Sequence, residues 1–301
     1  MNILKSVQII EVGPRDGFQN VSKFIPTEIK QTVVEKLINS GIKRIQITSF
    51  VSPKAIPQMR DAKELSEKFL QKYPDMELFA LCPNLKGVEI ASQCGYKEVS
   101  LVMSLSESHN KANINMSVQE SLVQIDRIKQ AFPDMIISQD IATAFGCPFE
   151  GEIQIDLLLE LIYRINTFGI NRIVLCDTIG IASPNLVRRT LRSVKKEFSK
   201  IEFNVHIHDT RNLGILNSFI AAEEGITGIQ TSICGLGGCP FAPGAAGNTA
   251  TEDLVYLFNK EGYKTDINFN KLMECAKFVQ ENIEGQMSGH QIKIDTSVRC
   301  I

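Results

Sequence analysis

The chain lacks an excess of charge of one sign and lacks a long apolar run. Its 32 lysine and arginine residues against 34 aspartate and glutamate residues give a formal net charge of -2. This balance gives no reason to expect a nucleic acid or an anionic membrane surface as a partner. No apolar run approaches the roughly 20 residues of a membrane span, so no membrane partner is expected.

Signals for export and for cysteine-based sites are also missing. The first residues, MNILKSVQIIEVG, enter a strand-like run directly, without the apolar core and cleavage site of a secretory signal or the Arg-rich character of a transit peptide. The eight cysteines are scattered with no C-x-x-C pair, which argues against a zinc ribbon or a dithiol redox motif. We therefore expect a cytoplasmic protein with reduced thiols.

Strand-like and helix-like segments alternate along the whole chain. Strand patterns cover 7–12, 44–48, 77–81, 98–103, 135–142, 172–176, 202–208 and 228–233. Helical patterns cover 27–40, 61–72, 85–94, 117–132, 151–168, 183–199 and 213–224, and another starts near residue 249. Eight such units in about 230 residues, with short connections, predict a closed (β/α)8 barrel, the TIM barrel. An open dinucleotide-binding sheet has less support, because no G-x-G-x-x-G follows the first strand.

The composition is that of an ordinary soluble globule, with 44% hydrophobic and 22% charged residues. No linker rich in serine, glycine or proline marks a second domain. We predict a single domain over residues 1–301, with the barrel at about 7–258 and a helical addition covering the barrel at about 260–301.

Two of the four histidines lie two positions apart in the stretch IEFNVHIHDT, residues 201–210. Val205 and Ile207 alternate with His206 and His208, so both imidazoles point to one face of a strand. A half-exposed strand with a wet polar face would show the same pattern. In a barrel, however, the chemistry lies at the carboxyl ends of the strands. Because the two histidines end the seventh strand, we expect both rings in the barrel mouth.

Polar residues also stand at the ends of other predicted strands. Arg15 and Asp16 follow the first strand, Gln46 lies in the second, Asp140 in the fifth, and Asp177 ends the sixth. Taken singly, each is compatible with a structural role as a surface ion pair, a helix cap or a satisfied polar group in the core. Their shared level in the barrel makes them candidates for one site.

A glycine-rich stretch, CGLGGCPFAPGAAGNTATEDL, follows the eighth strand and holds five glycines between positions 235 and 247. It is not a Walker loop, since no G-K-[ST] follows. A floppy linker would have such a composition. Over a barrel mouth, the same segment can close as a lid that excludes water. Cys239 lies in its middle and Asn248 at its end.

Asp16, His206, His208 and Asn248 can together bring two nitrogens and two oxygens to one point. This mixed set suits a divalent metal with positions left open for water. Mg²⁺ or Mn²⁺ fits the oxygens, and Mn²⁺, Co²⁺ or Zn²⁺ fits the imidazoles. Asp209 either points away or fixes an imidazole from behind.

Several longer strings carry a specific resemblance over about residues 7–256. The strings are VGPRDGFQN, TSFVSPKAIPQM, PNLKG, GCPFEG, DTIG, HIHDT and GLGGCPFAPGAAGNTATEDLVY. In this order they resemble the 3-hydroxy-3-methylglutaryl-CoA lyases, metal-dependent TIM-barrel enzymes of the same broad group as isopropylmalate synthase. The resemblance implies retro-Claisen cleavage of such a thioester to acetyl-CoA and acetoacetate, with a divalent metal, Mg²⁺ or Mn²⁺ foremost, and CoA as part of the substrate. It also suggests a homodimer.

The resemblance assigns roles to individual residues. Arg15 matches the arginine that stabilises the enolate oxygen, and Cys239 matches a loop thiol that acts as proton donor or lid contact. Lys86, with Asn84 beside it in PNLKG, matches a lysine near the CoA moiety. The residues that match the metal ligands are Asp16, His206, His208 and Asn248.

Three positions depart from the lyase pattern. Gln46 stands where a glutamate is usual, and Asp140 and Arg211 stand where tyrosines are usual. One hypothesis is that Asp140 takes over part of the acid–base or electrostatic role lost at Gln46. Another is that Asp140 and Arg211 read a different acyl group. Two further functions stay open, a Claisen-type condensing enzyme and a non-catalytic metal and CoA binder.

Overall fold

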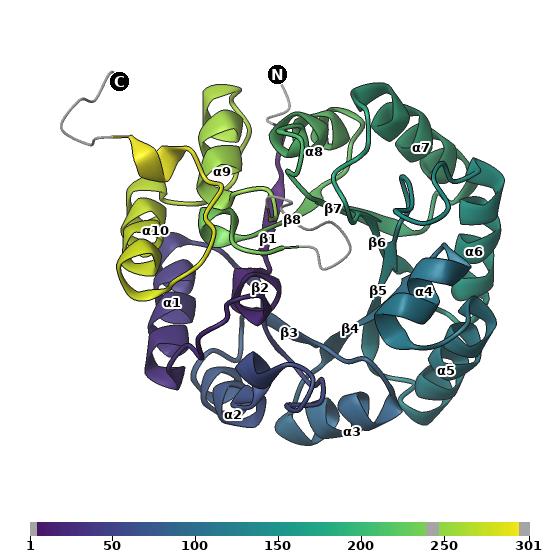
Figure 1. The fold of residues 1–301 in the computed structure, drawn as a ribbon, viewed down its shortest axis with the longest axis horizontal. Helices are drawn as coiled ribbons and strands as arrows, with labels where there is room; N and C mark the ends of the chain where they lie inside the picture. Colours follow the sequence, from purple (N-terminus) through teal and green to yellow (C-terminus); the bar gives the residue numbers. More distant parts are fainter. Residues whose placement is uncertain (1–4, 239–246, 295–301) are drawn as a thin grey trace.

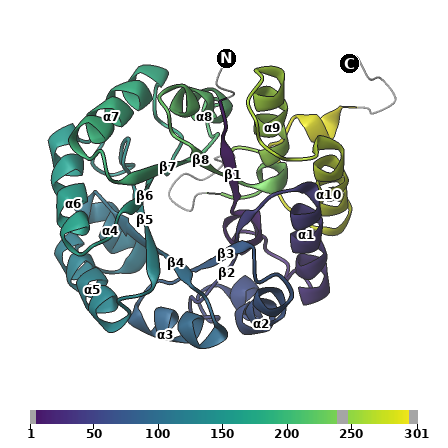
Figure 2. The ribbon, with the colours of Figure 1, turned by 180° about the vertical axis from the view of Figure 1, so that it is seen from behind.

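The computed structural model describes residues 5–238 and 247–294. Eight parallel strands close into a barrel in sequence order, with β8 paired to β1. Figure 1 shows the helices forming an outer ring around the strands, and Figure 2 shows the same ring from behind. The (β/α)8 barrel predicted from the sequence is confirmed. The strands are β1 (Gln8–Glu11), β2 (Arg44–Ser49), β3 (Glu77–Leu81), β4 (Glu98–Ser104), β5 (Ile136–Ala142), β6 (Arg172–Asp177), β7 (Glu202–Ile207) and β8 (Gly228–Thr231).

Ten α-helices are present in the described residues. They are α1 (Thr27–Ser40), α2 (Ala62–Lys72), α3 (Leu85–Cys94), α4 (Glu107–Ile114), α5 (Val118–Ala131), α6 (Ile155–Thr167), α7 (Pro184–Glu197), α8 (Gly214–Glu223), α9 (Thr251–Lys260) and α10 (Phe269–Asn282). Short helical turns cover Gly13–Gly17 (η1), Pro57–Met59 (η2), Ile233–Gly235 (η3) and Gln291–Lys293 (η4).

The barrel wall separates the main apolar core from an interior that holds a small apolar cluster, Ile10, Val12 and Phe79, and the polar side chains of the mouth. Val205 and Ile207 on β7 belong to the main hydrophobic core between the strands and the helices. His206, which alternates with them on β7, points into the barrel and meets the Gln230 side chain. Gln46 on β2 also points inward and meets the Arg15 side chain. The period-two pattern of the strands therefore places the polar residues of the mouth.

The helical addition after the barrel is confirmed and completes the outer ring. In Figure 1, α10 stands beside α1 and α9, at the place where the chain closes on itself. Leu272, Cys275, Ala276 and Val279 are its buried residues. In the described part of the chain, no helix is long and apolar enough to cross a membrane.

Two local predictions were wrong. The helix expected from residue 151 begins at Ile155, because Gly151 has φ +75° and forms an antiparallel bridge with Cys147. The stretch ESHNKANI, for which the sequence predicted no helix, is the helix α4. It begins where the Ser106 hydroxyl accepts the His109 N–H, and it ends at Asn115 in the left-handed region, so caps define it more than an apolar stripe.

Candidate active site

The first part of the site is the tight turn η1 that follows β1. The Val12 carbonyl accepts the N–H groups of Arg15 and Asp16, at 3.0 and 2.7 Å. Arg15 and Asp16 are each 7% exposed, and their side chains form an ion pair. The Arg-Asp pair is therefore a buried element of the barrel mouth and not a surface turn.

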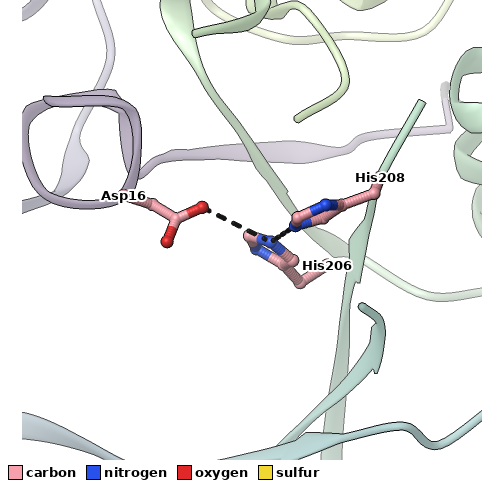
Figure 3. Close-up of side chains that lie close together, drawn as sticks. All are labelled: Asp16, His206 and His208. Atoms are coloured by element: carbon pink, nitrogen blue, oxygen red, sulfur yellow. Dashed lines mark hydrogen bonds and ion pairs between the residues drawn. The ribbon is translucent and has the colours of Figure 1, made fainter. Parts of the chain in front are cut away.

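The two histidines of the seventh strand face Asp16, as Figure 3 shows. The Nε2 atoms of His206 and His208 lie 3.1 Å apart, and Asp16 Oδ2 lies 3.9 Å from His206 Nε2. His206 Nδ1 lies 2.8 Å from the Gln230 side-chain oxygen, which can only accept. Nδ1 therefore carries the proton and Nε2 presents its lone pair toward Asp16 and His208.

Asn248 completes the group from the far end of the glycine-rich stretch. Its amide Nδ2 donates to Asp16 Oδ2 at 2.7 Å and to the Leu236 carbonyl at 3.0 Å. A Cβ on Gly237 would lie 2.6 Å from Asn248 Nδ2, and one on Gly247 would lie 2.6 Å from a backbone oxygen of Gly235. The two ends of the stretch can pass this closely only because both positions are glycine.

The donor set fits one divalent cation. Two ligands bound at about 2.1 Å to one ion would be about 4.2 Å apart at most, and the separations of 3.1 Å between the two histidine Nε2 atoms and of 3.9 Å between His206 Nε2 and Asp16 Oδ2 lie below this limit. In the described part of the chain, the buried Asn248 Oδ1 has no hydrogen-bond partner. A cation would satisfy this oxygen and the facing imidazole lone pairs at once.

The electrostatics of the group keep the ligands in their metal-binding forms. Burial alone would raise the pKa of Asp16, but the Arg15 guanidinium, with the hydrogen bond from Asn248, acts in the opposite direction, and the pKa is lowered to about 2. Burial lowers the pKa of His208 to about 3, with a further contribution from His206. It also lowers the pKa of His206, against the pull of Asp16. The site thus offers a carboxylate and two neutral imidazoles near neutral pH.

Arg15 links this group to the centre of the mouth. Its Nε donates to the Gln46 side-chain oxygen. Asp140 Oδ2 accepts the Ser100 hydroxyl at 2.8 Å. Among the described residues, neither Gln46 Nε2 nor Asp140 Oδ1 has a hydrogen-bond partner, although both are buried. Burial raises the pKa of Asp140 to about 6, although Ser100 and Arg15 act in the opposite direction.

One cavity of ≈ 540 Å³ at the barrel mouth is lined by Arg15, Asp16, Asp140, His206 and His208. Asn84 lines it too, after β3, as does Cys176 at the end of β6. A cavity of this size suits the acyl end of a small-molecule substrate, with buried polar groups to orient it.

Comparison with known proteins decides the family. The family model described as HMGL-like matches residues 6–279. The chain belongs to the HMGL-like family. The hydroxymethylglutaryl-CoA lyase of Bacillus subtilis is 38% identical, over 96% of this chain and 97% of that protein. The mitochondrial hydroxymethylglutaryl-CoA lyase of the rat is 39% identical, over 94% of this chain and 88% of that protein.

Solved structures agree with this assignment. The HMG-CoA lyase of Bacillus subtilis has a TM-score of 0.92 at 38% identity, covering 97% of this chain and 99% of that one. An HMG-CoA lyase from Acinetobacter baumannii, in complex with coenzyme A and 3-methylmalate, has a TM-score of 0.93 at 35% identity, covering 100% and 99%. The resemblance inferred from the sequence motifs is therefore confirmed.

Some predicted residues of this HMGL-like chain lie outside the cavity or outside the described residues. Lys86 is exposed on the first turn of α3 and is not among the lining residues. Arg211 is exposed, donates to the Ile179 and Gly180 carbonyls at 2.9 and 3.2 Å, and is not among the lining residues, so its part in reading an acyl group stays a prediction. Cys239 lies outside the described residues, and its role stays a prediction.

Two acids near the mouth of the HMGL-like barrel accept backbone N–H groups of the segments that follow them. Asp177 accepts the N–H groups of Ile181 and Ala182, at 2.9 and 3.0 Å, just before α7. Asp209 accepts the Gly214 N–H at 2.7 Å, at the start of α8. The structural interpretation of Asp177 is thus correct. Asp209 is committed to α8, which agrees with the expectation that it points away from the ion.

Gln230, Glu11 and His109 were missed by the sequence analysis. Gln230 sits beside His206 in the β7–β8 register and fixes its ring. Glu11 accepts the N–H groups of Gly13 and Ile233, at 2.8 and 2.9 Å, and so joins η1 to η3. An inward-facing glutamine or glutamate in a barrel strand is a signal that could have revealed the first two. His109 lay in the missed helix α4.

Proposed function

We propose that this chain is a divalent-metal-dependent carbon–carbon lyase. It cleaves 3-hydroxy-3-methylglutaryl-CoA, or a closely similar 3-hydroxyacyl-CoA, to acetyl-CoA and a keto acid such as acetoacetate. The observation that carries the proposal is the convergence of Asp16, His206, His208 and Asn248 at the mouth of the barrel, beside the cavity. The mitochondrial lyase of the rat and the lyase of Bacillus subtilis carry this activity in their names.

The metal, once bound by Asp16, His206, His208 and Asn248, would act as a Lewis acid that lowers the pKa of the substrate alcohol. A base takes the alcohol proton, and the O–H electron pair becomes the new C=O bond. The C–C pair then moves to the acetyl-CoA enolate, which is protonated at carbon. Arg15 is placed to hold the negative charge on the enolate oxygen, since its guanidinium is fixed between Asp16 and Gln46.

The change of glutamate to Gln46 removes one carboxylate, and Asp140 offers another. Gln46 still accepts the Arg15 N–H, so it preserves the position of the guanidinium without charge or basicity. Asp140 has a pKa raised by burial to about 6, which allows it to accept or donate a proton near neutral pH. We infer that Asp140 supplies part of the acid–base role. Cys239 remains a proposed proton donor or lid contact.

CoA would leave the cavity beside α3. Asn84 lines the cavity and its oxygen caps α3 by accepting the Gly87 N–H at 3.0 Å. Lys86 follows on the exposed first turn, where its ammonium can meet a phosphate of CoA without lining the acyl cavity. A homodimer and a cytoplasmic location complete the proposal.

The test is release of CoA or acetyl-CoA from purified protein with Mg²⁺ or Mn²⁺ and a panel of 3-hydroxyacyl-CoA thioesters. We expect turnover of methylglutaryl-CoA or a near relative, abolished by a chelator and restored by the metal. Turnover only with acetyl-CoA and a keto acid would identify a condensing enzyme instead. Thermal stabilisation by metal without any turnover would identify a binding protein.

A further inference from the structure

One side chain of the last barrel strand supports the metal-binding cluster from behind. Gln230 on β8 is 3% exposed, and its side-chain oxygen lies 2.8 Å from His206 Nδ1. His206 and Gln230 are partners in the β7–β8 register, so the contact joins neighbouring strands. Figure 3 shows the other edge of the same ring, where Nε2 faces Asp16 and His208. Gln230 therefore contacts a metal ligand on the edge that faces away from the cluster.

The second imidazole of the cluster has no such support. In the described part of the chain, His208 Nδ1 is buried without a hydrogen-bond partner. The carboxylate next to it in the sequence, Asp209, accepts the Gly214 N–H at 2.7 Å instead. Among the described residues, His206 is thus the one imidazole of the pair whose Nδ1 is held by a side chain.

The contact with Gln230 determines which nitrogen of His206 is free for a cation. Because the Gln230 oxygen can only accept, Nδ1 carries the ring proton and Nε2 keeps its lone pair. The register of the two strands also fixes the plane of the ring, since the hydrogen bond links buried side chains. His206 is therefore oriented for a cation before the cation binds.

Gln230 supplies a hydrogen-bond acceptor that carries no charge. A histidine that binds a metal usually donates its other N–H to a carboxylate, a carbonyl or water, and this partner tunes the basicity of the ring. A carboxylate is a stronger acceptor than an amide. Asp16 is the single carboxylate among the four proposed ligands, so a carboxylate at position 230 would add both basicity and negative charge. The neutral amide should give the weaker metal site of the two.

We propose that Gln230 is a positioning residue that orients His206 for the metal and, as an uncharged acceptor, keeps the affinity for the cation moderate. The inference rests on the proposed function for the presence of a divalent cation. It follows that the site exchanges its cation with the solution, so that activity depends on the free metal concentration. Gln230 exerts this effect through His206, without contacting the substrate.

Two substitutions of Gln230 should act in opposite directions. Gln230→Glu keeps the length of the side chain and strengthens the acceptor, whereas Gln230→Met keeps the length and accepts no hydrogen bond. Asn84→Asp is the charge control, because it adds a carboxylate to the cavity lining after β3, across the closed barrel from β7. There it can still accept the Gly87 N–H. The probe is Mn²⁺ alone, titrated calorimetrically into the metal-free full chain, which requires no turnover.

We expect Gln230→Met to weaken Mn²⁺ binding about 10-fold and Gln230→Glu to tighten it about 10-fold, the usual range for a residue behind a metal ligand. Asn84→Asp should stay within about 2-fold of the wild type, because solvent and salt screen a charge at the rim. In turnover assays, the Mn²⁺ concentration that gives half-maximal activity should shift in the same order.

The direction of the change in Gln230→Glu decides the test, because a disturbed fold weakens metal binding and does not tighten it. Weaker or unchanged binding in Gln230→Glu would overturn the inference, and so would equal tightening in Asn84→Asp. If the affinities follow the expected order but the wild type cleaves no hydroxyacyl-CoA, the lyase proposal fails and the role of Gln230 stands. If the wild type cleaves the thioester and both Gln230 variants bind Mn²⁺ as it does, only the role of Gln230 fails.

Discussion

The two ends of the barrel hold polar clusters of opposite character. At the amino-terminal end, Arg44, Glu98, Arg172 and Glu202 form a closed ring of alternating charge, with contacts of 2.5, 2.8, 2.9 and 3.5 Å. Among the described residues of this ring, one buried nitrogen, Arg44 Nε, lacks a hydrogen bond, and Glu77 lies 3.8 Å from it. Each carboxylate faces two guanidinium groups, so the charges of the cluster are paired within it.

At the carboxyl-terminal end of the barrel, by comparison, several buried polar atoms of the described residues lack hydrogen-bond partners. In the described part of the chain, polar atoms of Gln46, Asp140, His208 and Asn248 are buried without a hydrogen-bond partner. Unsatisfied buried groups cost stability, and in a barrel this end is where ligands bind. The difference indicates that the mouth is built for a cation and a substrate, whereas the ring at the other end is built for the fold alone.

The largest expected effect comes from removing a metal ligand at the mouth. His206→Ala should lower kcat/KM on the order of 10³-fold, since Lewis-acid catalysis contributes several kcal/mol and each 1.36 kcal/mol is tenfold. It should also abolish the rise in Tm on addition of Mn²⁺. The matched control is His290→Ala, which removes an exposed imidazole bound to Asp253 and should leave kcat unchanged. Wild-type kcat/KM in His206→Ala would contradict the metal site.

An arginine-to-glutamine substitution at each end of the barrel tests whether the two clusters serve different purposes. Arg15→Gln should lower kcat by about 10²–10³-fold, the effect of losing a donor to a developing oxyanion. Arg44→Gln removes one of the two guanidinium groups that face Glu98 and Glu202. It should lower the free energy of unfolding by about 3–5 kcal/mol. Kinetics and chemical denaturation of both variants check this. A stability loss for Arg15→Gln as large as that for Arg44→Gln, with kcat preserved, would show that the mouth is structural too.

The mouth end also buries Glu252, whose pKa shift has no contribution from a cation among the described residues. The glutamates of the charged ring at the other end, in contrast, are paired with arginines. Burial, with Asp253 and Glu11 adding to it, raises the pKa of Glu252 to about 8. The folded protein therefore retains a proton that the unfolded chain releases above about pH 4.5. By linkage, stability should fall as pH rises from about 4.5 to 8 and then level off, a loss of a few kcal/mol.

Glu252→Gln cannot titrate, so its Tm should vary less with pH over this window than that of the wild type. At pH 9 the variant should be the more stable of the two. Glu89→Gln, a change of an exposed glutamate, is the control and should follow the wild-type curve. Identical curves for Glu252→Gln and the wild type would mean that Glu252 is ionised in the folded protein.

The sequence predicted those parts of the molecule that depend on local periodicity. Alternating segments gave the barrel, and the period of two in β7 placed His206 and His208 on one face. The helix α4 was missed because caps and not an apolar stripe define it. The contact between His206 and Gln230 depends on the register of two strands that pair across 24 positions. The direction of the Arg211 side chain, toward the loop at residues 179–180, depends on the conformation of loops, which the periodicity of a sequence does not predict.

The smallest expected effect concerns Asp140. Asp140→Asn should lower kcat about 10-fold, less than the ~10²-fold of a complete acid–base contribution, because the metal and Arg15 remain. If Asp140 acts as a base, the wild-type kcat should rise with pH through about pH 6 as its carboxyl ionises. This limb of the pH profile should be absent in Asp140→Asn. Ser100→Ala removes the hydrogen bond that lowers the Asp140 pKa and should move the limb to higher pH. An unaltered kcat in Asp140→Asn, with the rise near pH 6 still present, would contradict an acid–base role for Asp140. Asp140 would then replace the usual tyrosine in shape alone, and the carboxylate lost at Gln46 would have no substitute at this position.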